Sequence, residues 1–246
     1  MSDDRKTLIL TGASRGIGHA TVQRFSDEGW RIITCSREDV PAECKRDPNW
    51  THHIVADLAD AGSLEHFVAE ASQLVGNGSL HALVNNAAIS PKADHGARLG
   101  SIDTTIDVWS HVFRVNFFAP IMLARGLIEE LKAAKGSVVN VTSIAGSRVH
   151  PFAGAAYATS KAALASLTRE MASDFGRVGI RVNAIAPGEI DTAILSPGTE
   201  DIVAHQIPMH RLGTPDEVSK IIYVLCTDTS SYVNGAEIHI NGGQHV

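Results

Sequence analysis

The sequence predicts a doubly wound α/β domain in which helices cover both faces of a mainly parallel, seven-stranded sheet. Short runs rich in β-branched residues alternate along the chain with longer amphipathic runs. The strand runs are almost continuously apolar, as expected for a parallel sheet buried on both faces. No linker, low-complexity tract or fixed-period repeat interrupts the 246 residues. Residues 1–246 are therefore expected to form one domain.

The elements follow one another in a regular order, with two irregular places. Residues 37–51 contain Pro41 and Pro48 and leave little room for a crossover helix, so that helix is expected to be short or lost. Residues 190–211 read as a loop with a short helical piece, within a substrate loop expected at about 189–211. The expected strands are 7–11, 31–36, 52–57, 82–86, 137–143, 181–187 and 236–241, and the expected helices are 19–29, 62–75, 107–134, 157–175 and 216–228.

Composition and charge narrow the possible partners. The net charge of −6 and the pI near 6.0 argue against nucleic acid or an anionic membrane surface and favour small molecules. We expect no signal peptide and no membrane span, because no run of 18 apolar residues occurs. Cys35, Cys44 and Cys226 lack CxxC spacing, which indicates reduced thiols in a cytoplasmic protein. Without HExxH or a Cys/His cluster at ligand spacing, no metal site is expected.

A glycine-rich turn, TGASRGIG at residues 11–18, lies between the first strand and the first helix. Gly12 permits a tight turn, and Gly16 and Gly18 allow close approach of the backbone. The helix N-terminus then offers N–H groups and the positive end of its dipole to a pyrophosphate. The alternative is an ordinary turn that contains glycines by chance. The strand before it and the helix after it favour nucleotide binding.

The end of the second strand bears on the choice of cofactor. An acid there would bind the adenosine ribose and select NAD, but the chain has Ser36 and Arg37. Arg37, together with Arg15 in the glycine turn, suits a 2′-phosphate and favours NADP(H). Alternatively both arginines are solvated and Glu38 or Asp39 contacts the ribose, which keeps NAD(H) possible.

The stretch YATSK places Tyr157 and Lys161 four residues apart, on one face of a predicted helix. A nearby ammonium stabilises phenolate and lowers the tyrosine pKa from about 10, as a general acid/base at neutral pH requires. Ser143 ends the strand SVVNVTS, where its hydroxyl can donate to a substrate carbonyl. The alternatives are a surface tyrosine packed on a lysine stem and a serine that caps a turn.

Taken in order, these motifs resemble those of the short-chain dehydrogenase/reductase family over nearly all of the chain. Three further segments carry the resemblance: NNAA at residues 85–88, Asn116 in RVNFF, and APGEIDT at 186–192. The resemblance implies a single Rossmann-like domain that reduces carbonyls or oxidises alcohols with NAD(P)(H). Within the family, the sequence resembles in a general way the branch that contains 3-oxoacyl-acyl carrier protein reductases.

The family's catalytic roles are carried over to four residues. The resemblance implies that Tyr157 donates the proton in reduction and that Ser143 orients the substrate oxygen. It implies that Lys161 lowers the tyrosine pKa and binds the nicotinamide ribose, and that Asn116 holds a water linking Lys161 to solvent. Asn116 has an alternative role as a buried helix asparagine bonded to neighbouring backbone.

The cofactor contacts implied by the resemblance gather from six segments. Asp57 is expected to accept from the adenine amino group or, alternatively, to cap the helix that starts near Ala61. Ala88 replaces the family's usual glycine, and its methyl group should narrow the space beside the cofactor. The expected contacts are Gly12, Ser14, Arg15, Gly16, Ile17, Gly18, Arg37, Asp57, Leu58, Asn86, Ala87, Ala88, Tyr157, Lys161, Pro187, Gly188, Ile190 and Thr192.

Substrate identity and assembly are less well specified. His150 and Glu189 fall near the expected pocket and suggest a polar substrate contact, or else they are ordinary loop residues. By resemblance, the last strand and the helix at 216–228 form a dimer interface within a homotetramer or homodimer. Two other functions stay open: an NAD-dependent alcohol dehydrogenase of the same family, and a non-catalytic NAD(P)-binding sensor or scaffold. A sugar-nucleotide epimerase would need a larger C-terminal domain.

Overall fold

The computed structural model describes residues 5–39, 48–75, 78–192, 195–196 and 198–246. Within these residues seven strands, all parallel, form one sheet in the order β3-β2-β1-β4-β5-β6-β7. This confirms the predicted fold class. The strand order reverses between β1 and β4, and ligands of such sheets bind beyond the carboxyl ends of the strands at that point. The strands are β1 Thr7–Thr11, β2 Arg31–Ser36, β3 Trp50–Val55, β4 Ala82–Asn85, β5 Ser137–Val141, β6 Arg181–Pro187 and β7 Glu237–Ile240.

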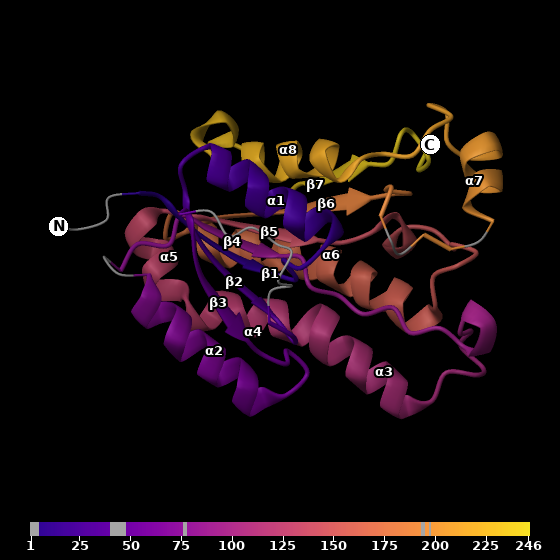
Figure 1. Cartoon of the computed structure of the whole chain (residues 1–246), viewed down its shortest axis with the longest axis horizontal. Coiled ribbons are helices and arrows are strands. Elements are labelled where there is room, and N and C mark those ends of the chain that lie inside the picture. The colour runs from indigo at the N-terminus through magenta and orange to yellow at the C-terminus, as the bar shows by residue number, and fades with distance from the viewer. Residues whose placement is uncertain (1–4, 40–47, 76–77, 193–194, 197) are drawn as a thin grey trace.

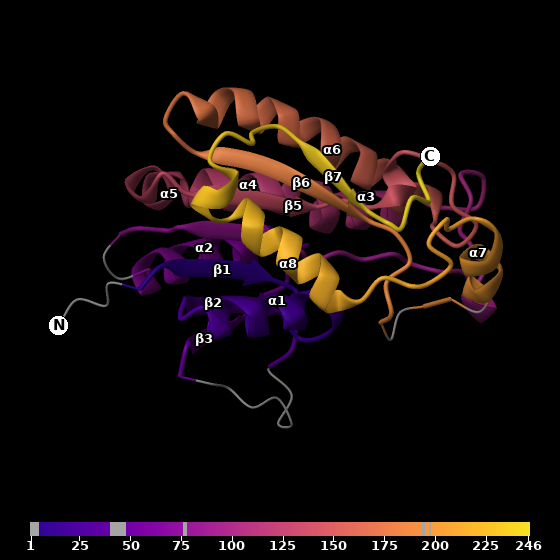
Figure 2. The ribbon, with the colours of Figure 1, turned by 90° about the horizontal axis from the view of Figure 1, so that it is seen from above.

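Helices cover both faces of the sheet. Figure 1 shows α1 and α8 on one side and α2, α3 and α4 on the other, and Figure 2 gives the view from the α8 side. The alternation of side chains along β1 serves both layers, because Leu8 and Leu10 join the cluster under α1 and α8 while Ile9 joins the opposite one. The helices are α1 Gly16–Asp27, α2 Ala61–Leu74, α3 Ile106–Phe113, α4 Ala119–Gly126, α5 Ile128–Ala134, α6 Ala155–Gly176, α7 Thr199–His205 and α8 Pro215–Leu225.

The helix expected over residues 107–134 is interrupted twice, so that prediction was wrong in detail. A π-helical turn, Arg114–Phe118, joins α3 to α4. Leu127, with φ −108° and ψ 20°, then leaves helical geometry and separates α4 from α5. Amphipathic periodicity alone did not reveal either interruption, since it reports an average over several turns and not the geometry of one turn.

The two irregular places differ in how far they can be described. Residues 40–47, within the proline-containing connection, lie outside the described residues, as does Cys44. In the second place α7 forms the short helical piece expected between 190 and 211, and it lies at the end of the sheet toward which β6 points (Figure 1). None of the helices in the described part of the chain is long and apolar enough to cross a membrane.

Candidate active site

The glycine turn is built from close backbone contacts, as its spacing predicts. Gly12 has φ +71° and directly follows β1, and its N–H donates to Cys35 O at 2.9 Å. A Cβ on Gly18 would lie 2.0 Å from Gly12 O, and a Cβ on Gly12 would lie 2.9 Å from Ala87 Cα. Side chains at these positions would push the start of α1 away from the sheet, so the glycines hold the helix N-terminus over the end of β1.

Asn86 locks this turn to the neighbouring strand end. Its Nδ2 donates to Gly12 O at 2.8 Å and to Thr11 O at 3.1 Å, while the N–H groups of Asn86 and Ala87 donate to Thr11 Oγ1. Thr11 therefore positions the β4 end, a role that the sequence did not reveal. A hydroxyl residue immediately before the first glycine was the available signal.

The end of β2 has its backbone fixed by side chains. Ser36 Oγ donates to Glu38 O at 2.6 Å, and His53 Nε2 lies 3.0 Å from the same carbonyl oxygen. Arg15 and Arg37 are exposed. Neither guanidinium has a hydrogen bond or ion pair to another residue that the structure describes, so both can reach a ligand at this end of the sheet.

Asp57 lies just beyond β3, and the expectation that it might cap α2 was wrong. Asp60 is the N-cap of α2, and its carboxylate accepts from Ser63 N at 2.7 Å. The Asp57 carboxylate instead accepts from Ala59 N at 2.9 Å, within the turn that precedes the helix. Leu58 is buried beside it. A hydrogen bond from the adenine amino group to the Asp57 carboxylate remains a prediction.

Ser143, Tyr157 and Lys161 come together at the carboxyl end of β5. Gly146 packs so tightly on α6 that a Cβ there would lie 2.9 Å from Ala162 N, which brings the segment after β5 against the helix. The Ser143 side chain lies close enough to Tyr157 to lower the pKa of the phenol. Ser143 Oγ accepts from Ala145 N at 3.2 Å, so Ser143 also caps the turn after β5.

Lys161 is buried and held by backbone. Only 2% of the residue is exposed, and its Nζ donates to Val141 O at 2.6 Å. The Nζ lies 5.7 Å from the centre of the Tyr157 ring. Burial lowers the pKa of Lys161 to about 7, because a charged ammonium loses hydration there.

The pKa of Tyr157 is raised overall, so a lowering by Lys161 does not dominate it and stays a prediction. Burial of Tyr157 raises its pKa, the hydrogen bond from Ser143 opposes that rise, and the charge of Glu189 adds to it. With its own pKa at about 7, Lys161 is only partly charged at neutral pH. The phenol therefore keeps its proton at neutral pH, which suits a proton donor.

Asn116 sits in the π-helical turn and is fully buried. Its Nδ2 donates to Ile89 O and to Ser160 Oγ, both at 3.0 Å, and its Oδ1 accepts from Ile89 N at 2.9 Å. These bonds match the alternative reading, a buried asparagine bonded to neighbouring backbone. A water relay through Asn116 stays a prediction.

The segment after β6 reaches back to the glycine turn. Gly188 directly follows β6 and packs closely against Asn241, because a Cβ on Gly188 would lie 2.6 Å from Asn241 Cβ. Ile190 is buried and pairs with Gly213 in an isolated bridge. Beyond it, the Thr192 methyl group lies 3.2 Å from the position of a Cβ on Gly16. The predicted contacts on both sides of the cofactor thus border one region.

His150 and Glu189 meet at the outer side of this region. His150 Nε2 lies 2.5 Å from Glu189 Oε1, and both side chains are about nine-tenths covered, with 10% and 11% exposed. Lys92, which the sequence did not single out, donates from its Nζ to Phe152 O. These residues come from the loops after β4, β5 and β6, and only their meeting in space reveals them as a group.

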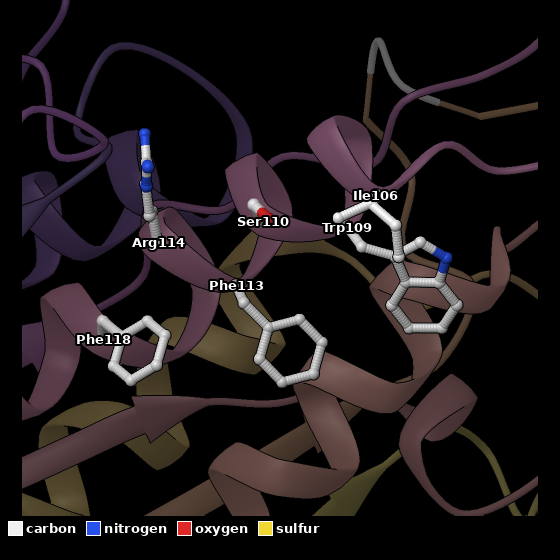
Figure 3. A pocket seen from close by; sticks show the side chains of 6 residues that line it. All are labelled: Ile106, Trp109, Ser110, Phe113, Arg114 and Phe118. Atoms are coloured by element: carbon white, nitrogen blue, oxygen red, sulfur yellow. The ribbon is translucent and has the colours of Figure 1, made fainter.

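The described residues form no metal-binding cluster, but they do form an apolar groove. In the described part of the chain, no group of three or more His, Cys, Asp or Glu side chains gathers as a metal site would require. An apolar groove of about 410 Å³ lies along α3 and the π-helical turn (Figure 3). It contains none of the predicted site residues, and its lining residues are Ile106, Trp109, Ser110, Phe113, Arg114 and Phe118.

Comparison with known proteins gives matches over nearly the whole chain. A family model described as Enoyl-(Acyl carrier protein) reductase matches residues 12–245. Protein FixR of Bradyrhizobium diazoefficiens is 58% identical over 242 residues, 98% of this chain and 87% of that protein. The 3-oxoacyl-[acyl-carrier-protein] reductase of Thermotoga maritima is 33% identical over 247 residues, 97% of each. A crystal structure of a Brucella ovis short-chain dehydrogenase/reductase, in complex with a partially ordered NAD, is 62% identical, covers 97% of this chain and 100% of its own, and has a TM-score of 0.84.

Proposed function

The chain belongs to the short-chain dehydrogenase/reductase family, and from that premise we propose that it transfers a hydride between NADP(H) and a small carbonyl or alcohol substrate. The meeting of the pair Ser143 and Tyr157, with Lys161 Nζ 5.7 Å from the centre of the phenol ring, is the observation that carries the proposal. This pair lies at the carboxyl edge of the sheet, the edge on which the glycine turn also opens.

The residues present fit a dinucleotide. Gly12 and Gly18 leave no room for a Cβ, and the N-terminus of α1 is aimed at the space where a pyrophosphate would lie. Residues of the glycine turn and of the 187–192 segment would hold it. When bound, the dinucleotide supplies or accepts the hydride at its nicotinamide ring.

In the direction of reduction, Ser143 orients the carbonyl oxygen and Tyr157 protonates it as the carbon gains the hydride. The products are an alcohol and a phenolate, which regains its proton from solvent. The charged fraction of Lys161, 5.7 Å from the ring, stabilises that phenolate while it lasts. In the direction of oxidation the same phenolate takes the alcohol proton. A water relay that starts at Asn116 is part of the proposal.

Two exposed arginines support NADP(H) as the cofactor. Arg15 and Arg37 lie at the two loops that border the adenosine end, and guanidinium groups bind phosphate with high specificity. NAD(H) is the second candidate, because the Brucella ovis relative is described with NAD. The backbone carbonyl of Glu38, fixed by Ser36, would then face the ribose.

The cofactor proposal is tested by fluorescence titration. NADPH is expected to bind at least about tenfold more tightly than NADH, the preference expected for one added phosphate contact. Arg37→Ala should reduce that ratio, whereas the exposed Arg169→Ala on α6 should leave it unchanged. Equal affinities, or tighter NADH, would overturn the choice of NADP(H) in favour of NAD(H).

Turnover is tested with both cofactors against ketones, aldehydes, 3-oxoacyl thioesters and sugar alcohols. Reduction or oxidation of any of them supports the proposed reaction. Inertness toward every compound, with retained cofactor binding, would favour a non-catalytic sensor. Residues 189–211, which include α7, would form the substrate loop in this proposal.

We also propose a cytoplasmic homotetramer. Ile106 and Phe118 of the apolar groove are 76% and 50% exposed, and β7 pairs only with β6 among the described strands, so surfaces for association are present. Cys35 and Cys226 are free and buried, as in a reducing compartment. Light scattering of the purified protein tests the assembly, and a monomer at micromolar concentration would contradict it.

A further inference from the structure

A charged cluster on the substrate side of Tyr157 takes no part in the chemistry proposed above. We propose that this cluster, Lys92 with Glu189 and His150, selects a short substrate that carries a carboxylate, and that Lys92 binds the carboxylate. The inference rests on the proposed function, because it names the substrate class of that same site.

Within the cluster, the hydrogen bonds of His150 fix the position of Glu189. The backbone N–H of Phe152 donates to His150 Nδ1 at 3.2 Å, so this nitrogen presents its lone pair. The ring proton is therefore on Nε2, which donates to Glu189 Oε1 at 2.5 Å. The imidazole thus holds the Glu189 side chain in one orientation, with little freedom because both side chains are mostly covered.

Glu189 in turn acts on Lys92. Burial lowers the pKa of Lys92, and the negative charge of Glu189 opposes part of that lowering. The two side chains nevertheless form no direct ion pair among the contacts of the described residues. The ammonium is half-buried and donates to one backbone carbonyl, Phe152 O, so two of its three N–H groups have capacity for an anion.

The cluster lies next to the reacting phenol. Glu189 follows the end of β6, beside the end of β5 where Ser143 stands, and its charge acts on both Tyr157 and Lys92. Phe152, which accepts from Lys92, lies five residues before Tyr157. Phe152 also packs on the substrate loop, with its Cζ 3.2 Å from the position of a Cβ on Gly198. Because the charge of Glu189 acts on both Tyr157 and Lys92, the substrate in this proposal is a short one.

The contacts around the phenol leave Lys92 available to an added anion. Lys161 faces Tyr157 from α6, Lys92 lies in the loop after β4, and Glu189 lies after β6. Glu189 is bonded to His150 and not paired with Lys92 among the described contacts, so the Lys92 ammonium can bind a substrate carboxylate.

The test compares short oxo acids with their neutral amides, namely pyruvate with pyruvamide, acetoacetate with acetoacetamide, and levulinate with levulinamide. For the pair of best-fitting length, we expect kcat/KM to be roughly tenfold to a hundredfold higher for the acid, as for a charge-assisted hydrogen bond. Lys92→Met should remove that preference mainly through KM.

Arg98→Met is the matched control. Arg98 Nε donates to Ala153 O at 2.8 Å, so Arg98 ties the same loop to the same segment as Lys92 does. If Lys92 only held the loop to this segment through its hydrogen bond, both variants would change kcat/KM for acids and amides equally. Arg98→Met should retain the preference for the acid, and thermal unfolding of both variants checks that they fold.

The outcomes separate this inference from the proposed function. Equal use of acid and amide by the wild type, or an unchanged preference in Lys92→Met, overturns the inference while the reductase stands. If no compound is reduced, binding of acetoacetate and acetoacetamide is measured by calorimetry with NADPH present. Tighter binding of the acid that depends on Lys92 would then support the subsite although the proposed reaction fails, and equal binding would overturn it.

Discussion

The floor of the site and its rim are built on different principles. The floor comprises the glycine turn at 11–18, Asn86, Asn116, Ser143, Tyr157 and Lys161, and the rim comprises Lys92, His150, Phe152 and Glu189. In the floor, side chains are bonded chiefly to backbone: Asn86 to Gly12 O, Asn116 to Ile89, and Lys161 to Val141 O. In the rim, one contact joins two ionisable side chains, His150 and Glu189, that lie 39 residues apart.

This difference indicates a division of labour. Backbone positions change little when side chains are substituted, so a floor held by carbonyl and N–H groups keeps the same geometry for any substrate. A rim made of side chains can change its charge without changing the fold. The floor thus accounts for reaction type, and the rim accounts for the compound that reacts.

The largest effect is expected where the floor meets the substrate. Tyr157→Phe removes the proton donor and should lower kcat by about 10² to 10⁴ while cofactor affinity stays nearly intact. Because the phenol serves every substrate, the loss should be similar for acids and amides. Steady-state kinetics and a cofactor titration measure both quantities. Appreciable remaining turnover would remove Tyr157 from its role.

A smaller effect, on stability, should follow from filling the floor. Gly18→Ala places a methyl group where Gly12 O lies 2.0 Å away, and this overpacking should cost roughly 1–3 kcal/mol of unfolding free energy and weaken cofactor binding. Gly62→Ala is the control, because in α2 its Cβ would meet only Asp60 Oδ1 at 3.5 Å. Urea unfolding of both variants gives the comparison. If Gly18→Ala were as stable as the wild type and bound cofactor normally, the glycine turn would have to shift enough to accommodate the methyl group.

The smallest effect couples the rim to the floor. The anionic Glu189 raises the pKa of Tyr157, so Glu189→Gln should lower it. Since oxidation needs phenolate, its rate should then begin to rise at lower pH than in the wild type. His150→Gln keeps the carboxylate and should move the profile less. The tyrosinate absorbance, measured as a difference from Tyr157→Phe, reports the same ionisation. If the pH profile of oxidation is the same in Glu189→Gln as in the wild type, the rim has no electrostatic effect on the floor.

Sequence patterns foresaw the floor far better than the rim. Glycine spacing, strand ends and the i, i+4 relation of Tyr157 to Lys161 are local signals, and each depends on backbone geometry. The direction of the Tyr157 pKa could not be foreseen, because burial is the largest cause of its rise and burial depends on the whole fold. Lys92 gave no local signal, since its partners lie in loops after other strands.

The π-helical turn also sets a rotational phase. Its five residues, Arg114–Phe118, fit one residue more into the turn than an α-helix would, and each α-helical residue advances the helix by about 100°. Deleting a single residue here would leave a more regular helix. It would also swing everything downstream by more than a quarter circle, and Asn116 would lose its place against Ile89. The extra residue of the π-helical turn fixes the rotation of α4 relative to the sheet. This segment should therefore tolerate substitutions far better than changes in length.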